Sequence, residues 1–197
     1  RGLEFIADPA SVEGEIVGWS DDEVYLEGVG LVRLFVEDLA RPLDTSLLAR
    51  GLALLEVVIR RDPAKWAAHW FPGLGYRRIR SHQRSYEALE RAHTIAPNEW
   101  GTRVEFVVAC LHVGRAELAL PVARRLVEES GGHADTRTNL ALALLFQGEL
   151  EAARREIEVA VAQAPEDPVI AAAHEVVEAV CTGQRPRPTS LLELESA

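Results

Sequence analysis

The stretch HEVVE, from His174 to Glu178, is the part of the sequence closest in residue type to a catalytic motif. Zinc proteases place two histidines one helical turn apart, where both bind the metal. Glu178 stands here in the position of the second histidine, so a solvated helix face is the favoured interpretation. The remaining histidines show no ligand spacing: His69, His82, His93, His112 and His133. We therefore expect no metal site.

Other catalytic arrangements are missing from the sequence. It contains no glycine-rich phosphate loop, no G-x-S-x-G elbow and no Cys-x-x-Cys pair. Cys110 and Cys181 lie in apolar, helix-like surroundings, where cysteine usually behaves as a small hydrophobic residue. This usage fits a reducing cytoplasm. We expect a cytoplasmic protein that is not an enzyme and that binds no cofactor.

Charge limits the class of partner. The 31 acidic and 21 basic residues give a formal net charge of -10. Proteins that bind nucleic-acid backbones or anionic membranes need positive surface, and no run of 18 apolar residues is present to span a bilayer. The cluster RRIRSHQR, from Arg77 to Arg84, could hold an acidic peptide or a phosphate, although a solvated turn is the favoured interpretation. We expect a protein partner, with neither nucleic acid nor membrane.

The sequence repeats itself every 34 residues, within a chain of 197 residues that is long enough to bury a substantial core. Helix-breaking residues, small residues and larger apolar residues each recur at their own positions of the 34-residue period, and we call each such set of positions a register. The breakers are Pro63, Pro97, Gly131 and Pro165, and the small residues are Gly51, Ser85, Ala119 and Ala153. Two apolar registers hold Leu55, Leu89, Ala123 and Ile157, and Val58, Ala92, Leu126 and Ala160. Each unit is therefore expected to be helix, tight turn, helix.

A 34-residue helical hairpin with a small residue at the helix crossing and a proline at its end resembles the tetratricopeptide repeat. Residues 134–167 carry the pattern most fully, and residues 100–133 carry it with Pro121 inside the second helix. Residues 65–99 deviate, because Pro72 occupies a first-helix core position and predicts a short or kinked helix. The resemblance covers roughly residues 45–180. It implies a mainly α fold, an α-solenoid of helical hairpins.

The two ends differ from the repeats. The segments EIVGW, EVYLEG and GLVRLFVED are β-branched and partly alternating, which predicts a small N-terminal β appendage over residues 1–43; the alternative is that Leu31 to Ala40 forms a helix that completes the first hairpin. Residues 44–181 are expected to form the repeat domain, ending in a capping helix. Residues 182–197 are expected to be a proline-rich linker and flexible tail. The start at Arg1 suggests a fragment or a processed product.

First helices line the concave surface of such solenoids, and their side chains outside the core registers define a candidate groove. Its apolar anchors are expected to be Trp70, Leu74, Val108, Leu111, Leu142 and Phe146, its polar residues His112 and Asn139, and its electrostatic guides Arg77 and Arg78. Some members of the family hold a peptide carboxylate with lysine and asparagine. Asn139 fits that pattern, but the facing positions are not basic.

The expected function is a non-catalytic interaction scaffold or chaperone that binds a peptide or helical segment through apolar anchor residues. The alternative is an accessory subunit whose groove mediates homo-oligomerisation. A further alternative is that the groove is filled by the N-terminal segment or by the C-terminal LLELE stretch.

Overall fold

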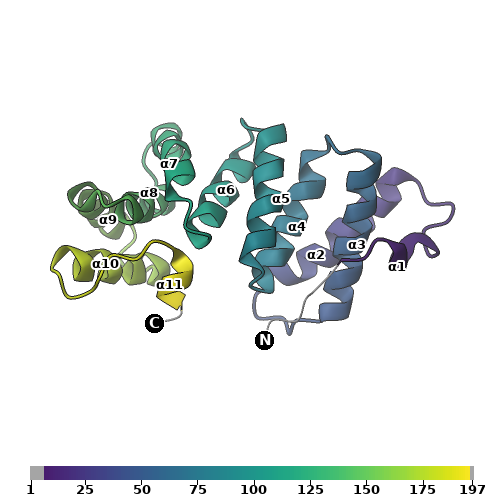
Figure 1. Ribbon diagram of the computed structural model, residues 1–197, viewed down its shortest axis with the longest axis horizontal. Coiled ribbons are helices and arrows are strands. Elements are labelled where there is room, and N and C mark those ends of the chain that lie inside the picture. The colour runs from purple at the N-terminus through teal and green to yellow at the C-terminus, as the bar shows by residue number, and fades with distance from the viewer. Residues whose placement is uncertain (1–6, 196–197) are drawn as a thin grey trace. The chain divides into compact units, whose positions relative to one another are not determined.

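Helices are the regular elements of residues 7–195, the part of the chain that the computed structural model describes. The chain forms two compact units, residues 1–102 and 103–197. The first contains α1 (Ala10–Glu13), α2 (Asp21–Val36), α3 (Thr45–Arg61), α4 (Trp66–Arg78) and α5 (His82–Ile95) (Figure 1). The second contains α7 (Ala116–Ser130), α8 (Ala134–Gln147), α9 (Leu150–Gln163), α10 (Pro168–Cys181) and α11 (Leu191–Glu195), and α6 (Trp100–His112) spans the division. Residues 1–6 and 196–197 of the predicted appendage and tail lie outside the described residues.

The predicted β appendage is wrong for the described part of the chain, because residues 21–36 form helix α2. Ser20 begins this helix with a capping box, in which its hydroxyl accepts from the N–H of Glu23 and the Glu23 carboxylate accepts from the N–H of Ser20. The buried positions Val24, Val32 and Phe35 follow a helical rather than a twofold period. The alternative of a helix completing the first hairpin was therefore closer, although that helix begins ten residues earlier than proposed.

α2 and α3 pair across two glycines. A Cβ placed on Gly51 would lie 2.8 Å from the Cβ of Leu31 and 3.1 Å from the carbonyl oxygen of Gly28. A Cβ on Gly28 would lie 3.0 Å from Leu55 and 3.2 Å from the carbonyl oxygen of Gly51. The two backbones therefore approach more closely than alanine would permit. This pair is the first helical hairpin. It joins α2, from the expected appendage (residues 1–43), to α3, from the expected repeat domain (residues 44–181).

α4 and α5 form the second hairpin in the same way. A Cβ on Gly73 would lie 2.5 Å from Leu89, and the Ser85 hydroxyl donates to the carbonyl of Gly73 over 2.8 Å. Pro72 lies inside α4, which nevertheless extends over 13 residues, so of the two expectations the short helix is not observed and the kink stays a prediction. A small residue again sits where the second helix crosses the first.

The connection between α2 and α3 is held by Arg78 of α4. Its guanidinium donates to the carbonyl oxygens of Phe35 at 3.0 Å, Leu39 at 3.2 Å and Arg41 at 3.3 Å. These oxygens belong to the end of α2 and to the residues that follow it, where no helical N–H is available to them. Arg78 thereby ties a long connection to the second hairpin.

In the second unit, α7, α8, α9 and α10 pack in succession, each against the next. The registers of the repeat are buried, with Ala119, Ala123 and Leu126 of α7 matching Ala153, Ile157 and Ala160 of α9. Gly131 and Gly148 end α7 and α8 in the left-handed conformation, with φ of 70° and 87°. An ion pair of 2.6 Å between the buried Arg103 and Glu129 joins this part of α6 to α7.

Two glycines of α2 provide a matched test of the close approach. Gly28→Ala should lower the free energy of unfolding by about 1–3 kcal/mol, because the added methyl group meets α3. Gly30→Ala, on the exposed side of the same helix with nothing within 4 Å of its Cβ, should raise it by about 0.5–1 kcal/mol. Chemical denaturation followed by circular dichroism measures both. Equal effects would contradict the role given to Gly28.

Candidate protein-binding site

An open apolar pocket of about 450 Å³ lies in the second unit between α8, α10 and the C-terminal segment, residues 184–195. Its lining is almost entirely apolar. The residues are Leu142 of α8, Pro168, Val169, Ala172, Ala173 and Val176 of α10, and Arg185, Leu191 and Leu194 of the C-terminal segment. Val169 is 71% exposed, so the pocket opens to solvent over the first turn of α10. An exposed apolar surface of this kind favours a protein partner.

The start of α10 places this surface. Asp167 caps the helix and accepts from the N–H groups of Val169 at 2.8 Å and Ile170 at 3.1 Å, while Pro168 occupies the first turn. Ile170 and Val177 then face the core. Val169, Ala172 and Val176, spaced by three and four residues, form the opposite stripe that lines the pocket.

The C-terminal segment contacts the rest of the second unit at several points. The N–H of Arg185 donates to the carbonyl of Ala179 over 3.0 Å, which turns the chain back after α10. The guanidinium of Arg187 donates to the carbonyl of Phe146 at the end of α8. Pro188 and Ser190 are buried. Residues 184–195, which belong to the segment that the sequence interpreted as a linker and flexible tail, therefore make contacts within this unit.

The short helix α11 begins with a cap of its own. The side chain and the N–H of Thr189 donate to Glu193 over 2.5 Å and 2.9 Å, and the N–H of Glu193 donates to Ser190 over 3.4 Å. These bonds from Thr189 lower the pKa of the Glu193 carboxyl. At the end of the helix, Glu195 lies 3.5 Å from His112 of α6. α11 is thus capped at its start by bonds within the segment, and it contacts α6 at its end.

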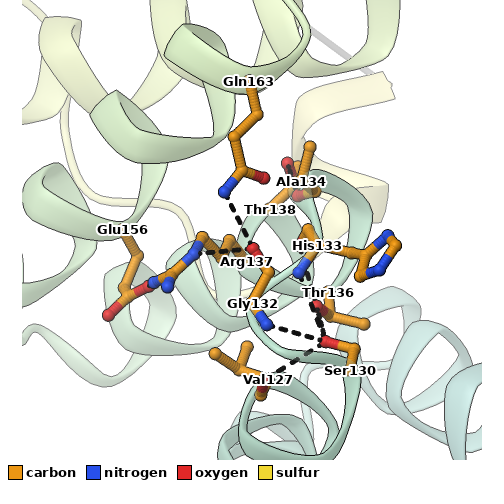
Figure 2. Close-up of polar contacts among 10 residues, drawn as sticks. All are labelled: Val127, Ser130, Gly132, His133, Ala134, Thr136, Arg137, Thr138, Glu156 and Gln163. Carbon is orange, nitrogen blue, oxygen red and sulfur yellow. Dashed lines mark hydrogen bonds and ion pairs between the residues drawn. The ribbon is translucent and has the colours of Figure 1, made fainter.

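Hydrogen bonds hold the turn before α8, the helix that carries Leu142. Figure 2 shows these bonds: the Ser130 hydroxyl accepts from the N–H of Gly132 at 3.2 Å, and the Gly132 carbonyl accepts from Arg137 at 2.9 Å and Gln163 at 3.0 Å. Arg137 also forms an ion pair of 2.5 Å with Glu156 of α9. Side chains of α8 and α9 therefore hold this turn, in which Gly131 takes the position that proline has in the other repeats.

The predicted groove residues of the second unit are more enclosed than a free surface would be. The relative exposure is 0% for Leu111, 8% for Leu142 and 4% for Phe146, whereas Val108, His112 and Asn139 are half-buried. Every residue of α8 from Leu140 to Phe146 is buried. The anchors Leu111 and Phe146 are therefore not open to a partner in this structure, and Leu142 borders the pocket. The binding role of these residues stays a prediction.

The predicted groove residues of the first unit form a separate set. Leu74, Arg77 and Arg78 line a shallow pocket of about 240 Å³ together with Val36 and Leu39. Arg78 is not an available electrostatic guide, because its guanidinium holds the connection after α2. Trp70 is half-buried and donates its indole N–H to the carbonyl of Gly101 over 3.3 Å. Its binding role, and those of Leu74 and Arg77, also stay predictions.

The sequence reasoning missed the residues of α10 and α11 that line the pocket. The signal was present in the spacing of Val169, Ala172 and Val176 along α10, and in Leu191 and Leu194, three residues apart. It was overlooked because α10 was interpreted as a polar capping helix from His174, Glu175 and Glu178. Glu178 in fact forms an ion pair of 2.9 Å with Arg154 of α9.

The geometry defines a helical-hairpin repeat protein of the α-solenoid type. Residues 111–176 match the family model of the tetratricopeptide repeat, which confirms the resemblance found in the sequence. A comparison with curated proteins found no match.

Three solved structures share the fold of this chain. A structure of MamA MSR-1 has a TM-score of 0.65 at 18% identity and covers 90% of this chain and 98% of its own. MamA 41-end from Desulfovibrio magneticus RS-1 has a TM-score of 0.58 at 18% identity, with 80% and 93% covered. YrrB, described as a TPR protein with an unusual peptide-binding site, has a TM-score of 0.64 at 16% identity, with 95% and 88% covered. At these identities the likeness shows the fold.

The adjacent glycines before α8 should differ in their tolerance to substitution. Gly132→Asn should lower the free energy of unfolding by about 1–3 kcal/mol, because a Cβ there meets the guanidinium of Arg137, which is held by Glu156. Gly131→Asn should change it by less than about 1 kcal/mol, because asparagine tolerates the left-handed conformation and nothing lies within 4 Å. Urea denaturation distinguishes the two, and a larger loss at Gly131 would contradict the network.

Proposed function

We propose that this protein is a non-catalytic scaffold, or a chaperone, that binds a segment of another protein at the pocket between α8, α10 and the C-terminal segment. The observation that carries the proposal is the apolar stripe of α10, which is exposed beside an open pocket with leucines on its other side. The tetratricopeptide-like fold supports it, because arrays of this kind present such surfaces to protein partners.

The chemistry of the pocket limits the partner. Its lining favours side chains of leucine or valine size, and Arg185 supplies the one charged group of the described lining. The formal net charge of -10 favours a basic or neutral partner over a nucleic acid. None of the helices in residues 7–195 combines the length and apolar character of a membrane span. Cys110 and Cys181 are thiols rather than a disulfide, which supports the proposed cytoplasmic location.

Self-association is the second candidate function, and the first unit favours it with a different surface. Leu26 and Leu39 are 66% and 71% exposed, and Leu26 lies on the same outer face of α2 as Leu34. Light scattering of the purified chain tests this alternative. A stable dimer that Leu26→Glu converts to monomer would support an accessory subunit, and a monomer would exclude it.

Substitutions at the pocket test the scaffold proposal. The double variant Val169→Asp with Ala172→Glu should reduce partner capture at least 10-fold, because it places charge on the apolar stripe. Both positions are exposed, so the free energy of unfolding should change by less than about 1 kcal/mol. Capture is measured by quantitative mass spectrometry of proteins retained from a lysate of the source organism.

Val159→Asp is the matched control, because Val159 is a 40% exposed valine on the neighbouring helix α9. It should retain the capture of the unchanged protein. Equal capture by the double variant and by this control would contradict a binding role for the pocket.

A further inference from the structure

We propose that the C-terminal segment, residues 184–195, is a built-in competitor for the binding site of the second unit, and that the partner has the chemistry of this segment. Such a partner carries a cationic side chain followed by a short helix with leucines three residues apart and an acidic end. This inference rests on the proposed function and names the kind of segment that the site accepts.

The first part of the argument is how the segment contacts two successive first helices. Arg187 donates to the carbonyl of Phe146, and its guanidinium lies 3.6 Å from the Cβ position of Gly148 at the end of α8. The carbonyl of Thr189 lies 3.4 Å from the Cβ position of Gly114, at the end of α6. The chain thus crosses the carboxyl ends of both helices, where a cation is favoured by the unpaired carbonyls.

The burial of α8 gives the second part. A helix of a two-layer array normally leaves one face to solvent, but α8 is buried from Leu140 to Phe146. α7, α9 and α10 pack against it, and the C-terminal segment contacts Phe146 and borders the pocket beside Leu142. The segment therefore contributes to covering the face that the sequence assigned to a ligand.

The third part is that the segment is held incompletely. α11 has five residues, too few for a helix to be stable by itself in water. Leu191 and Leu194 are half-buried, and the open pocket lies next to both. Residues 182–184, which connect the segment to α10, are exposed. A partner segment that displaces Leu191 and Leu194 can cover the apolar residues of α8 and α10 that these half-buried leucines leave open.

Charge defines the ends of the expected partner segment. The cation corresponds to Arg187, which is placed at the carbonyl end of α8, and the acidic end corresponds to Glu195, 3.5 Å from His112. The cap from Thr189 to Glu193 sets the start of the helix between them. These features give the segment one direction across the site.

A reversible disulfide can hold the segment in place. A Cβ on Gly114 would lie 3.6 Å from the Cβ of Ser190, within the range of about 3.5–4.5 Å found in disulfides. The variant Gly114→Cys with Ser190→Cys is made with Cys181→Ser, because Cys181 is half-buried, whereas the buried Cys110 is retained. The control is Gly114→Cys with Cys181→Ser, which carries the same cysteine in the left-handed conformation (φ 74°) and cannot form the bond.

The probe is a fluorescein-labelled peptide of residues 184–197, and its binding to the full chain is measured by fluorescence anisotropy. Leu191→Asp with Leu194→Asp should weaken the attachment of the segment and bind the probe at least 10-fold more tightly than the unchanged protein, because a tethered competitor acts at an effective concentration on the order of 1 mM. The oxidised disulfide variant should not bind the probe, and reduction should restore binding to the level of its control.

The outcomes separate this proposal from the proposed function. Equal probe binding by the unchanged protein and the Leu191→Asp with Leu194→Asp variant, with circular dichroism showing that both are folded, would overturn it. Unchanged probe binding by the oxidised disulfide variant would also overturn it. A dimer that this double leucine variant dissociates would show exchange of the segment between copies and overturn the proposal. In each case, loss of capture by Val169→Asp with Ala172→Glu would leave the scaffold function standing.

Discussion

Close contact between paired helices is the constraint on which the rest of the structure depends. At each crossing the second helix carries a small buried residue, Gly51, Ser85, Ala119 or Ala153. In the first hairpin both helices have glycine, and the backbones meet without an intervening side chain. The larger residues one and two turns later can then fill the space between helices, which is why these apolar registers are almost fully buried. A larger residue at the crossing would push the two helices apart and weaken all of these packing contacts at once.

The repeat was predictable because it is written at a constant spacing. Leu55, Leu89, Ala123 and Ile157, selected from their register alone, are all fully buried. The first helix of the array was missed because the connection after it is longer. From Gly28 to Gly51 the crossing glycines are 23 residues apart (51 − 28), whereas Gly73 and Ser85 are 12 apart (85 − 73). The 34-residue spacing therefore does not extend to α2. Its valines at positions 24, 29, 32 and 36 are typical of a strand when the capping box at Ser20 is overlooked.

The candidate site was only partly accessible to sequence reasoning. A periodic sequence predicts which residues face a neighbouring helix, and one of the first-helix positions that it selected, Leu142, borders the pocket. It does not predict where an irregular segment returns. The position of residues 184–195 depends on bonds between distant parts of the chain, such as Arg187 to Phe146 and Glu195 to His112, which leave no period in the sequence.

The C-terminal segment lies against two helix ends, where Arg187 donates to the carbonyl of Phe146 beside Gly148 and the carbonyl of Thr189 lies beside Gly114. These two glycines occupy the same place in consecutive hairpins. Contacts of this sort depend on the shape of a helix end and very little on the side chains around it. Repeat arrays lengthen by gene-level duplication of whole hairpins, and each new copy would bring its own glycine and its own terminal carbonyls. The segment could therefore settle on whichever two hairpins come last, so the array can change in length while keeping the same closure at its end.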